Sequence, residues 1–402
     1  MTAASASGAN ARMHNLKYVA LVAPSVLIAF GMAPASAACV TNGTTITCDA
    51  TTPQSTIIGG GDAPAGDGTT VLVQSNASVA VGDSPAISLR DGANITVSSG
   101  ATVSATAVAT AGGYGTGGNT IEVRSRGTIT IDQGGSVLAL GTQGSGEAIN
   151  LQGGNNTVTN NGLIRAFNAA AIWIQSSTGV NTIVNNATGV IQAPGAVLGV
   201  SGTATIDFTN HGQVIGDLVF ADGDDFLHIF TGSQITGTLS GGGGSDNVVL
   251  SGTGSDAISG TFAGFELLTK NDSGTWTITG AITGPTAVIV DAGTLIITGD
   301  NSAYAGSVSV NPAGTLQGRA QVLPQAITDN GLVRFAQTDD GTYAGLITGT
   351  GAVEKTGAGV LTLAPAAVGG NTYSGGTIIT QGVLAIAADN AIGAATGPLT
   401  FN

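Results

Sequence analysis

Charged and aromatic residues are scarce in this sequence of 402 residues, at 8% and 4% of the chain. Basic residues are scarcer still, because 10 Lys and Arg stand against 24 Asp and Glu and give a formal net charge of −14 at pH 7. An acidic surface of this kind repels phosphate backbones and anionic lipid headgroups. The composition therefore argues against nucleic acid as a partner and leaves calcium and basic host proteins open.

Cysteine is nearly absent, and the two cysteines, Cys39 and Cys48, lie close together. Their spacing argues against a redox motif, and no group of His, Cys and Asp residues has the spacing of a transition-metal site. In an exported chain such a pair forms a structural disulfide, which we expect to close a short loop that caps the first part of the fold. The glycine-rich turns lack a following Lys and helix, so no phosphate-binding loop and no cofactor is predicted.

A long apolar run occurs only near the start of the chain. Basic residues precede a largely apolar stretch at 18–32, and an Ala-Ser-Ala sequence ends at Ala37. This pattern is typical of a secretory signal peptide over residues 1–37, cleaved between Ala37 and Ala38. Pro24 and the short apolar core argue against the alternative, a transmembrane anchor.

Glycine is plentiful, with 65 residues, and apolar residues alternate with polar ones along most of the chain. Linkers and disordered chains lack this alternation, whereas short strands between tight turns require it. Asn-Thr-Ile or a close variant recurs in residues 156–164, 181–191 and 204–215, and the glycines of these units, Gly162, Gly189 and Gly212, are 27 and 23 residues apart. Such a repeat predicts a solenoid in which aliphatic side chains and turn asparagines form ladders from coil to coil. We expect an all-β fold, a right-handed parallel β-helix, with residues 38–218 as its N-terminal coils.

Residues 219–264 differ from the rest by their Gly-Asp clusters. Residues 241–249 match the calcium-binding nonapeptide G-G-x-G-x-D-x-U-x once. The aspartates concerned, Asp225, Asp246 and Asp256, are 21 and then 10 residues apart, whereas a calcium β-roll needs copies nine residues apart. We therefore interpret the clusters as turns between β-helix coils, with a calcium-binding β-roll as the alternative.

Residues 265–402 contain a longer motif, in which glycine-framed apolar runs flank an Asn-x-Tyr-x-Gly-x-Thr sequence. This motif resembles the passenger-associated repeat of bacterial autotransporters, the type V secreted proteins. The residues that fit its pattern are Lys355, Gly357, Gly359, Leu361, Leu363, Asn371, Tyr373, Gly375 and Thr377. Earlier runs at 265–270 and 274–280 also resemble these passengers, and Trp276 within them is expected to pack in a strand rather than to bind a ligand.

The resemblance implies a pertactin-like β-helix and an exported passenger, which we expect to be non-enzymatic. It also implies an outer-membrane translocation β-barrel as partner, which this sequence does not include, so we interpret the chain as a truncated passenger or a fragment. The expected location is the cell surface or outer membrane if the chain is linked to a barrel. Otherwise the passenger would be periplasmic or secreted.

Some passengers are enzymes, and this sequence contains three candidates for catalytic residues. Ser84, Asp225 and His228 occur in sequences that echo serine hydrolases. In a β-helix, however, Ser84 and His228 would lie about 30 Å apart, because successive coils stack at about 4.8 Å. We therefore predict a cell-surface adhesin or interaction protein that binds a host cell or matrix. The alternatives are a catalytic passenger, a scaffold for secretion and folding, and the calcium-binding β-roll.

Overall fold

The computed structural model describes residues 39–402 apart from residue 53 and residues 60–66, 83–84, 107–117 and 142–145. The predicted signal peptide, its cleavage site Ala37–Ala38 and Ser84 lie outside the described residues. The described residues form short β-strands and one helical turn, η2 (Asp389–Ile392). No helix among them is long and apolar enough to cross a membrane.

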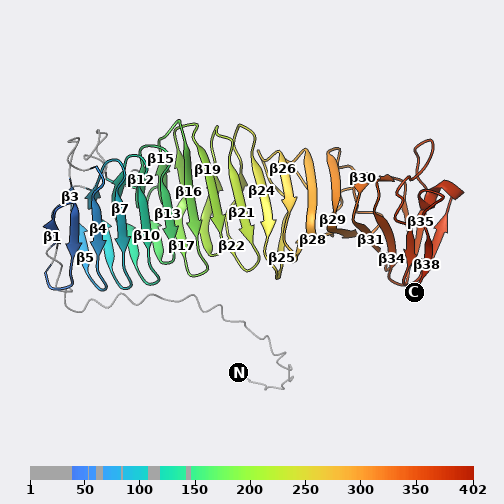
Figure 1. The fold of residues 1–402 in the computed structure, drawn as a ribbon, viewed down its shortest axis with the longest axis horizontal. Helices are drawn as coiled ribbons and strands as arrows, with labels where there is room; N and C mark the ends of the chain where they lie inside the picture. Colours follow the sequence, from blue (N-terminus) through green and yellow to red (C-terminus); the bar gives the residue numbers. More distant parts are fainter. Residues whose placement is uncertain (1–38, 53, 60–66, 83–84, 107–117, 142–145) are drawn as a thin grey trace, which may run out of the picture. The chain divides into compact units, whose positions relative to one another are not determined.

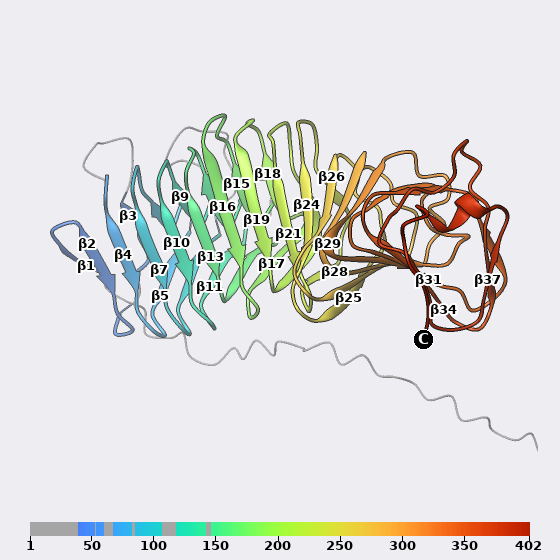
Figure 2. The same ribbon diagram turned by 45° about the vertical axis from the view of Figure 1, so that its right-hand side comes forward.

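The strands stack in parallel, coil upon coil, and each coil has up to three legs (Figure 1). The first leg runs almost the length of the solenoid, and Figure 2 shows many of its strands side by side. It comprises β2 (Thr45–Cys48), β4 (Thr70–Val73), β7 (Asn94–Val97), β10 (Thr128–Ile131), β13 (Thr157–Asn160), β16 (Val180–Asn185), β19 (Thr205–Asn210), β21 (Phe226–Phe230), β24 (Asn247–Ser251), β26 (Leu267–Lys270), the first halves of β28 (Ala287–Ile297) and β29 (Ser307–Gly318), β30 (Ala326–Asp329) and β33 (Leu346–Thr348).

The second leg consists of two separate ladders of parallel strands. The first contains β5 (Ser78–Val81), β8 (Thr102–Ala105), β11 (Ser136–Ala139), β14 (Leu163–Ala166), β17 (Val190–Ala196), β20 (Gln213–Val219) and β22 (Gln234–Ile235). The second contains β25 (Ser255–Ile258), β27 (Thr275–Ile278), the second halves of β28 and β29, β31 (Leu332–Ala336), β34 (Ala352–Thr356), β36 (Thr377–Ile379) and β38 (Leu399–Phe401).

The third leg has the shortest strands. Its N-terminal part contains β3 (Ile58–Gly59), β6 (Ile87–Ser88), β9 (Ile121–Val123), β12 (Ile149–Leu151), β15 (Ile172–Ile174) and β18 (Leu198–Val200). Further along, β23 (Leu239–Ser240) pairs with the end of β20, and β32 (Gly341–Tyr343), β35 (Val360–Leu363) and β37 (Val383–Ile386) form a small sheet. The all-β, parallel solenoid predicted from the sequence is confirmed.

The core is a set of aliphatic rows that follow from the alternation in the sequence. Along β13, β16 and β19, for example, Val158, Ile183 and Phe208 pair in register and have no exposed surface. Alternate residues of a strand point to opposite faces, so every second residue enters the core. Full burial of such a side chain contributes about 1.5–3 kcal/mol.

Asparagines form a second kind of ladder at the end of the first leg. The side-chain Nδ2 of Asn160 donates to Oδ1 of Asn185, and Asn185 donates in the same way to Asn210, at 2.8 Å each. All three side chains are fully buried. An amide is both donor and acceptor, so a stack of asparagines satisfies each member through its neighbours. The predicted asparagine ladder is confirmed.

The N-terminal end of the described solenoid is covered by an antiparallel strand. β1 (Cys39–Asn42) pairs with β2, and Cys39 and Cys48 are joined by a disulfide, as their spacing predicted. β1 therefore occupies the edge of β2 that faces away from the next coil, where an open edge would invite pairing with another chain.

Candidate functional site

The second leg is interrupted once within residues 146–402, all of which the structure describes. β22 pairs only with β20, and β25 pairs only with β27, so two strand edges face each other without a shared hydrogen bond between the strands. The same two coils do pair on either side of this break, through Phe230 with Ser251 and through Ser240 with Ala263. The break is therefore a slot that is closed at both ends.

The sequence explains why β25 stays apart from β22. Ten residue steps separate Phe230 from Ser240, whereas twelve separate their partners Ser251 and Ala263, so the second coil is longer between the same two contacts. In addition, Asp256 occupies the inward row that continues through Trp276 and Leu295. An ionised carboxylate is costly to bury without a partner, so this position keeps access to solvent.

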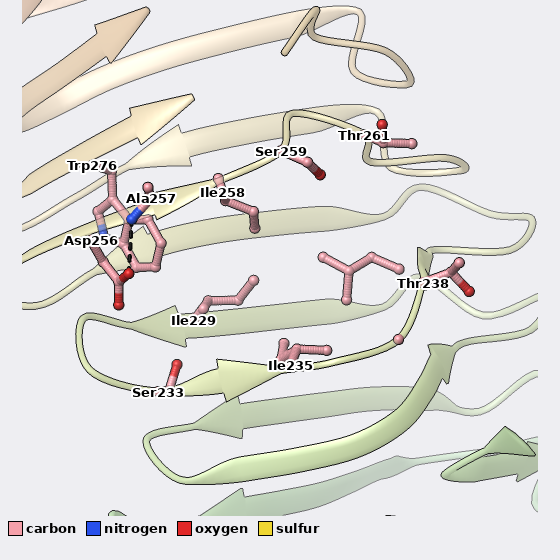
Figure 3. A pocket seen from close by; sticks show the side chains of 12 residues that line it. Ile229, Ser233, Ile235, Thr238, Asp256, Ala257, Ile258, Ser259, Thr261 and Trp276 are labelled. Carbon is pink, nitrogen blue, oxygen red and sulfur yellow. Dashed lines mark hydrogen bonds between the residues drawn. The ribbon is translucent and has the colours of Figure 1, made fainter. Parts of the chain in front are cut away.

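The slot forms a groove with a volume of about 490 Å³. Figure 3 shows side chains from both edges directed into it, Ile235 from β22 and Ile258 from β25, and Ile229 of β21 also lines it. Trp276 contributes to the wall but is only 2% exposed, and its Nε1 donates to the carbonyl oxygen of Ser251 at 2.9 Å. The prediction that Trp276 is packed in a strand is confirmed, and one edge of its ring also lines the groove.

Asp256 bridges the two coils at one end of the groove. Its Oδ2 accepts the backbone N–H of Gly232 at 2.9 Å, and its Oδ1 accepts the N–H of Ala257 at 2.8 Å. The N–H of Gly254 likewise donates to Oγ1 of Thr231 at 3.2 Å. Side chains thus provide hydrogen bonds that strand pairing provides in the other coils.

The other two aspartates of the calcium hypothesis lie elsewhere. Asp225 accepts the N–H of Ile206 at 2.6 Å, and Asp246 in the next coil accepts the N–H of Asp225 at 2.7 Å. Asp256 does not join them, and the described residues contain no group of three or more His, Cys, Asp or Glu side chains placed to hold a metal ion. The three calcium candidates therefore do not form one site.

Burial dominates the electrostatics of Asp225 and Asp246. Desolvation, together with the nearby charges of Asp246 and Asp224, raises the pKa of Asp225 to about 7 despite the hydrogen bond from Ile206. Desolvation likewise raises the pKa of Asp246 to about 6. One carboxyl oxygen of each residue has no hydrogen-bond partner. Such an oxygen is less costly when it carries a proton, which agrees with the direction of both shifts.

The two described residues that echoed a hydrolase, Asp225 and His228, do not interact with each other. His228 points outward and its Nε2 lies 3.6 Å from Oδ1 of Asp207, whereas the Asp225 side chain is buried and bonded to Ile206. The structure therefore pairs His228 with a different aspartate from the one that the D-x-x-H spacing suggested. Ser84 lies outside the described residues.

Two buried lysines mark equivalent corners of the repeat region. The Nζ of Lys355 donates to the carbonyl oxygens of Thr356, Gly357 and Gln381 at 2.8, 2.6 and 2.9 Å. The Nζ of Lys270 donates to Asn271, Asp272 and Ala292 at 2.5, 2.9 and 3.0 Å. An ammonium group has three donors, and here each donor binds a backbone carbonyl that the corner leaves free.

Glycines of the motif leave room for these lysines. Gly382 has a φ of +82°, and a Cβ at this position would lie 2.7 Å from Nζ of Lys355. Gly293 has a φ of +68°, and its Cβ would lie 2.8 Å from Nζ of Lys270. The lysine and the glycine of the following coil are therefore parts of one corner.

The asparagines of the motif also connect successive coils, and its tyrosine, threonine and leucines are buried within the solenoid. Oδ1 of Asn371 accepts the N–H of Ile347 at 2.9 Å, and Oδ1 of Asn301 accepts the N–H of Ile282 at 2.7 Å. The hydroxyl of Tyr373 lies 2.7 Å from Oγ1 of Thr377, and both side chains are buried. Leu361 and Leu363 are fully buried.

A third tyrosine of this kind was missed in the sequence. The hydroxyl of Tyr343 donates to the carbonyl oxygen of Pro324 at 2.7 Å, as that of Tyr304 donates to Pro285 at 3.0 Å. Both tyrosines begin a Tyr-Ala-Gly sequence, and a Cβ on the glycine would lie within 2.6 Å of the hydroxyl. The shared Tyr-Ala-Gly was the signal that could have identified Tyr343.

Comparison with known proteins agrees with this geometry. The model of the passenger-associated transport repeat matches residues 268–289, 290–317 and 353–386. No curated protein and no solved structure gave a match. The matched segments contain both lysine corners. The first segment begins in β26, the strand that follows β25 along the chain. These repeats within a parallel β-solenoid fit a passenger domain of the autotransporter type, a class of protein exported across the inner membrane.

Proposed function

We propose that this passenger is a non-enzymatic adhesin or interaction protein at the cell surface, with the groove between β22 and β25 as its binding site. The interruption of the second leg carries the proposal, because it leaves two strand edges and apolar side chains accessible in a leg that is otherwise continuous over residues 146–402. Concave sites with a mainly apolar lining and a few polar groups are typical of binding sites. The proposed partner is a protein of the host cell surface or the extracellular matrix.

The charge of the molecule supports a basic or neutral partner. The chain has a formal net charge of −14, and Asp256 lies at the groove. Charge complementarity of this kind accelerates association with a basic partner and weakens association with an acidic one. We expect the interaction to weaken as the salt concentration rises, because salt screens exposed charges.

A scaffold for secretion and folding is the second candidate. The observation that favours it is the lysine corner, in which one side chain joins two successive coils at residues 355 and 381 and again at 270 and 292. Such corners favour stacking of each new coil on the previous one. Under this proposal residues 265–402 support passage through an outer-membrane barrel and the binding activity belongs elsewhere.

Binding to host material separates the two candidates. Purified full-length protein would be added to cultured epithelial cells and to surfaces coated with fibronectin, laminin or collagen. An adhesin gives saturable binding to at least one of these, above the level of an albumin coating. Binding that rises linearly with concentration and equals the albumin background would contradict the adhesin proposal and leave the scaffold.

A further inference from the structure

We propose that the groove between β22 and β25 accepts one extended segment of a partner protein, which completes the second leg as an added β-strand. This inference rests on the proposed function and specifies how the partner binds. Strand addition to an exposed sheet edge is a general mode of peptide recognition, in which main-chain hydrogen bonds provide affinity and pockets for alternate side chains provide specificity. Here two edges, rather than one, face the incoming strand.

The edge of β22 has backbone groups directed at the groove. The N–H groups of Gln234 and Thr236 donate to the preceding coil, to the carbonyl oxygens of Gly212 and Val214. Backbone groups alternate in direction along a strand, so those of Ile235 point the other way, into the groove. Within residues 146–402 no strand pairs with this edge.

The edge of β25 is arranged in the same way. The carbonyl oxygens of Gly254 and Ile258 accept N–H groups of the following coil, from Thr275 and Thr279. The backbone groups of Ala257 between them therefore point into the groove, and its N–H is bonded to the carboxylate of Asp256. A carbonyl oxygen of an added strand would take over this N–H and release the carboxylate for a basic side chain.

The inward side of the groove has an apolar part and a charged end. Ile235, Ile258 and Trp276 form an apolar wall for residues that point inward, and Asp256 lies at one end. The volume of about 490 Å³ is within the usual range for sites that bind a few residues or a small ligand. A short strand with apolar residues at its inward positions, and Lys or Arg at the inward position beside Asp256, fits this chemistry.

The closed ends of the slot determine which occupant can enter. The two coils are joined beyond the groove by the pairs Phe230–Ser251 and Ser240–Ala263, so there is no room for a folded sheet of a second copy. An extended arm or loop of a partner is narrow enough to lie between the edges, because strands pair at about 4.8 Å. The occupant is therefore a peptide segment.

Three labelled heptapeptides test the proposal with the full-length protein. The first is Ac-Thr-Lys-Thr-Val-Thr-Val-Thr-NH₂, which has its Lys on the same face as its valines, the second has Glu in place of Lys, and the third has N-methylated valines that no longer donate hydrogen bonds. Fluorescence anisotropy is expected to show saturable binding of the first peptide, and binding at least about tenfold weaker for each of the others.

Ala257 offers a matched pair of variants, because its side chain is exposed and its N–H faces the groove. Ala257→Pro removes this N–H and is expected to weaken binding of the Lys peptide about tenfold. Ala257→Val keeps the N–H and is expected to bind within about twofold of the unchanged protein. Melting curves of both variants show whether the solenoid is intact. If Ala257→Pro melts early, Asp256→Asn serves instead and is expected to abolish the preference for Lys over Glu.

Each result of these experiments either supports or overturns strand addition at the groove. Equal binding by Ala257→Pro and Ala257→Val with intact folds would overturn the groove as the site, as would equal binding of the N-methylated peptide. If the unchanged protein binds matrix-coated surfaces but none of the peptides, strand addition is wrong while the proposed adhesin function stands. Sedimentation of the protein alone reveals a dimer that Ala257→Pro abolishes if the occupant is a second copy, and that result would also overturn the proposal.

Discussion

At the scale of single residues, we expect the largest loss in the free energy of unfolding when a buried lysine is replaced. Lys355→Met keeps most of the apolar volume but leaves three carbonyl oxygens without a donor. We expect the free energy of unfolding to fall by about 2–4 kcal/mol, because an unsatisfied buried acceptor costs about 1–3 kcal/mol. Urea denaturation measures the change.

The exposed neighbour Val383 provides a control for this variant. Its side chain is 54% exposed and lies next to Gly382 of the same corner. Val383→Thr should change the free energy of unfolding by less than about 0.5 kcal/mol. A similarly small effect of Lys355→Met would show that the lysine does not stabilise the corner.

Buried aspartates give the solenoid an unusual dependence on pH. Burial raises the pKa of Asp329 to about 7, and one of its carboxyl oxygens has no partner. The folded state therefore binds a proton more tightly than the unfolded state, in which an aspartate has a pKa near 4. The stability that comes from this proton is fully present below pH 4 and is lost as the pH rises through about 7.

Asp329→Asn tests this dependence, because an amide does not titrate. We expect the unfolding free energy of the unchanged protein to fall between pH 4 and pH 7, and the variant to show a shallower fall. Exposed Asp217, whose hydrogen bonds lower its pKa, provides the control Asp217→Asn, which should leave the slope over this range unchanged. An identical slope in Asp329→Asn would contradict the assignment.

At the scale of structural elements, the asparagine ladder couples three coils. Asn185 accepts from Asn160 and donates to Asn210, so Asn185→Ala removes both bonds and leaves one N–H of the buried Asn160 amide without its acceptor. We expect a loss of about 2–4 kcal/mol in the free energy of unfolding. Asn186→Ala is the matched control, because this neighbour is less buried and makes its amide bond to Asn161 at the surface. Equal losses in the two variants would contradict a special role for the ladder.

The elements show where prediction from the sequence succeeds and where it fails. Alternation and the Asn-Thr-Ile units predicted strands, coils and the asparagine ladder, because these depend on residues that recur in each coil. The groove was not predicted, because the inward position of Asp256 follows from its register with Trp276. The contacts of Lys355 were hidden for a related reason, since one of its carbonyl partners belongs to the next coil, at Gln381.

At the scale of the whole molecule, the stability of a solenoid is approximately a sum over neighbouring coils. The contact between the coils of β22 and β25 lacks the strand pairing of the second leg. It should therefore be the weakest contact in the stack, and opening should begin there.

Hydrogen exchange in mild denaturant can locate this weak contact. We expect backbone amides of residues 232–239 and 254–261 to exchange faster than those of the flanking strands, with cooperative protection on either side. The continuous contact between β13 and β16 serves as the comparison within the same molecule. Uniform protection through residues 232–261 would argue against a weak contact at the slot.

The burial of the lysines has a consequence for handling the protein. The sequence has three lysines, and Lys270 and Lys355 have no exposed surface, while Lys17 lies in the predicted signal peptide. Amine-reactive dyes, biotin esters and lysine cross-linkers will therefore find no ε-amino group on the folded solenoid after signal cleavage. An amine-reactive dye at neutral pH should therefore label only the terminal amine of the folded protein. Labelling of Lys270 or Lys355 would show directly that a lysine corner has opened.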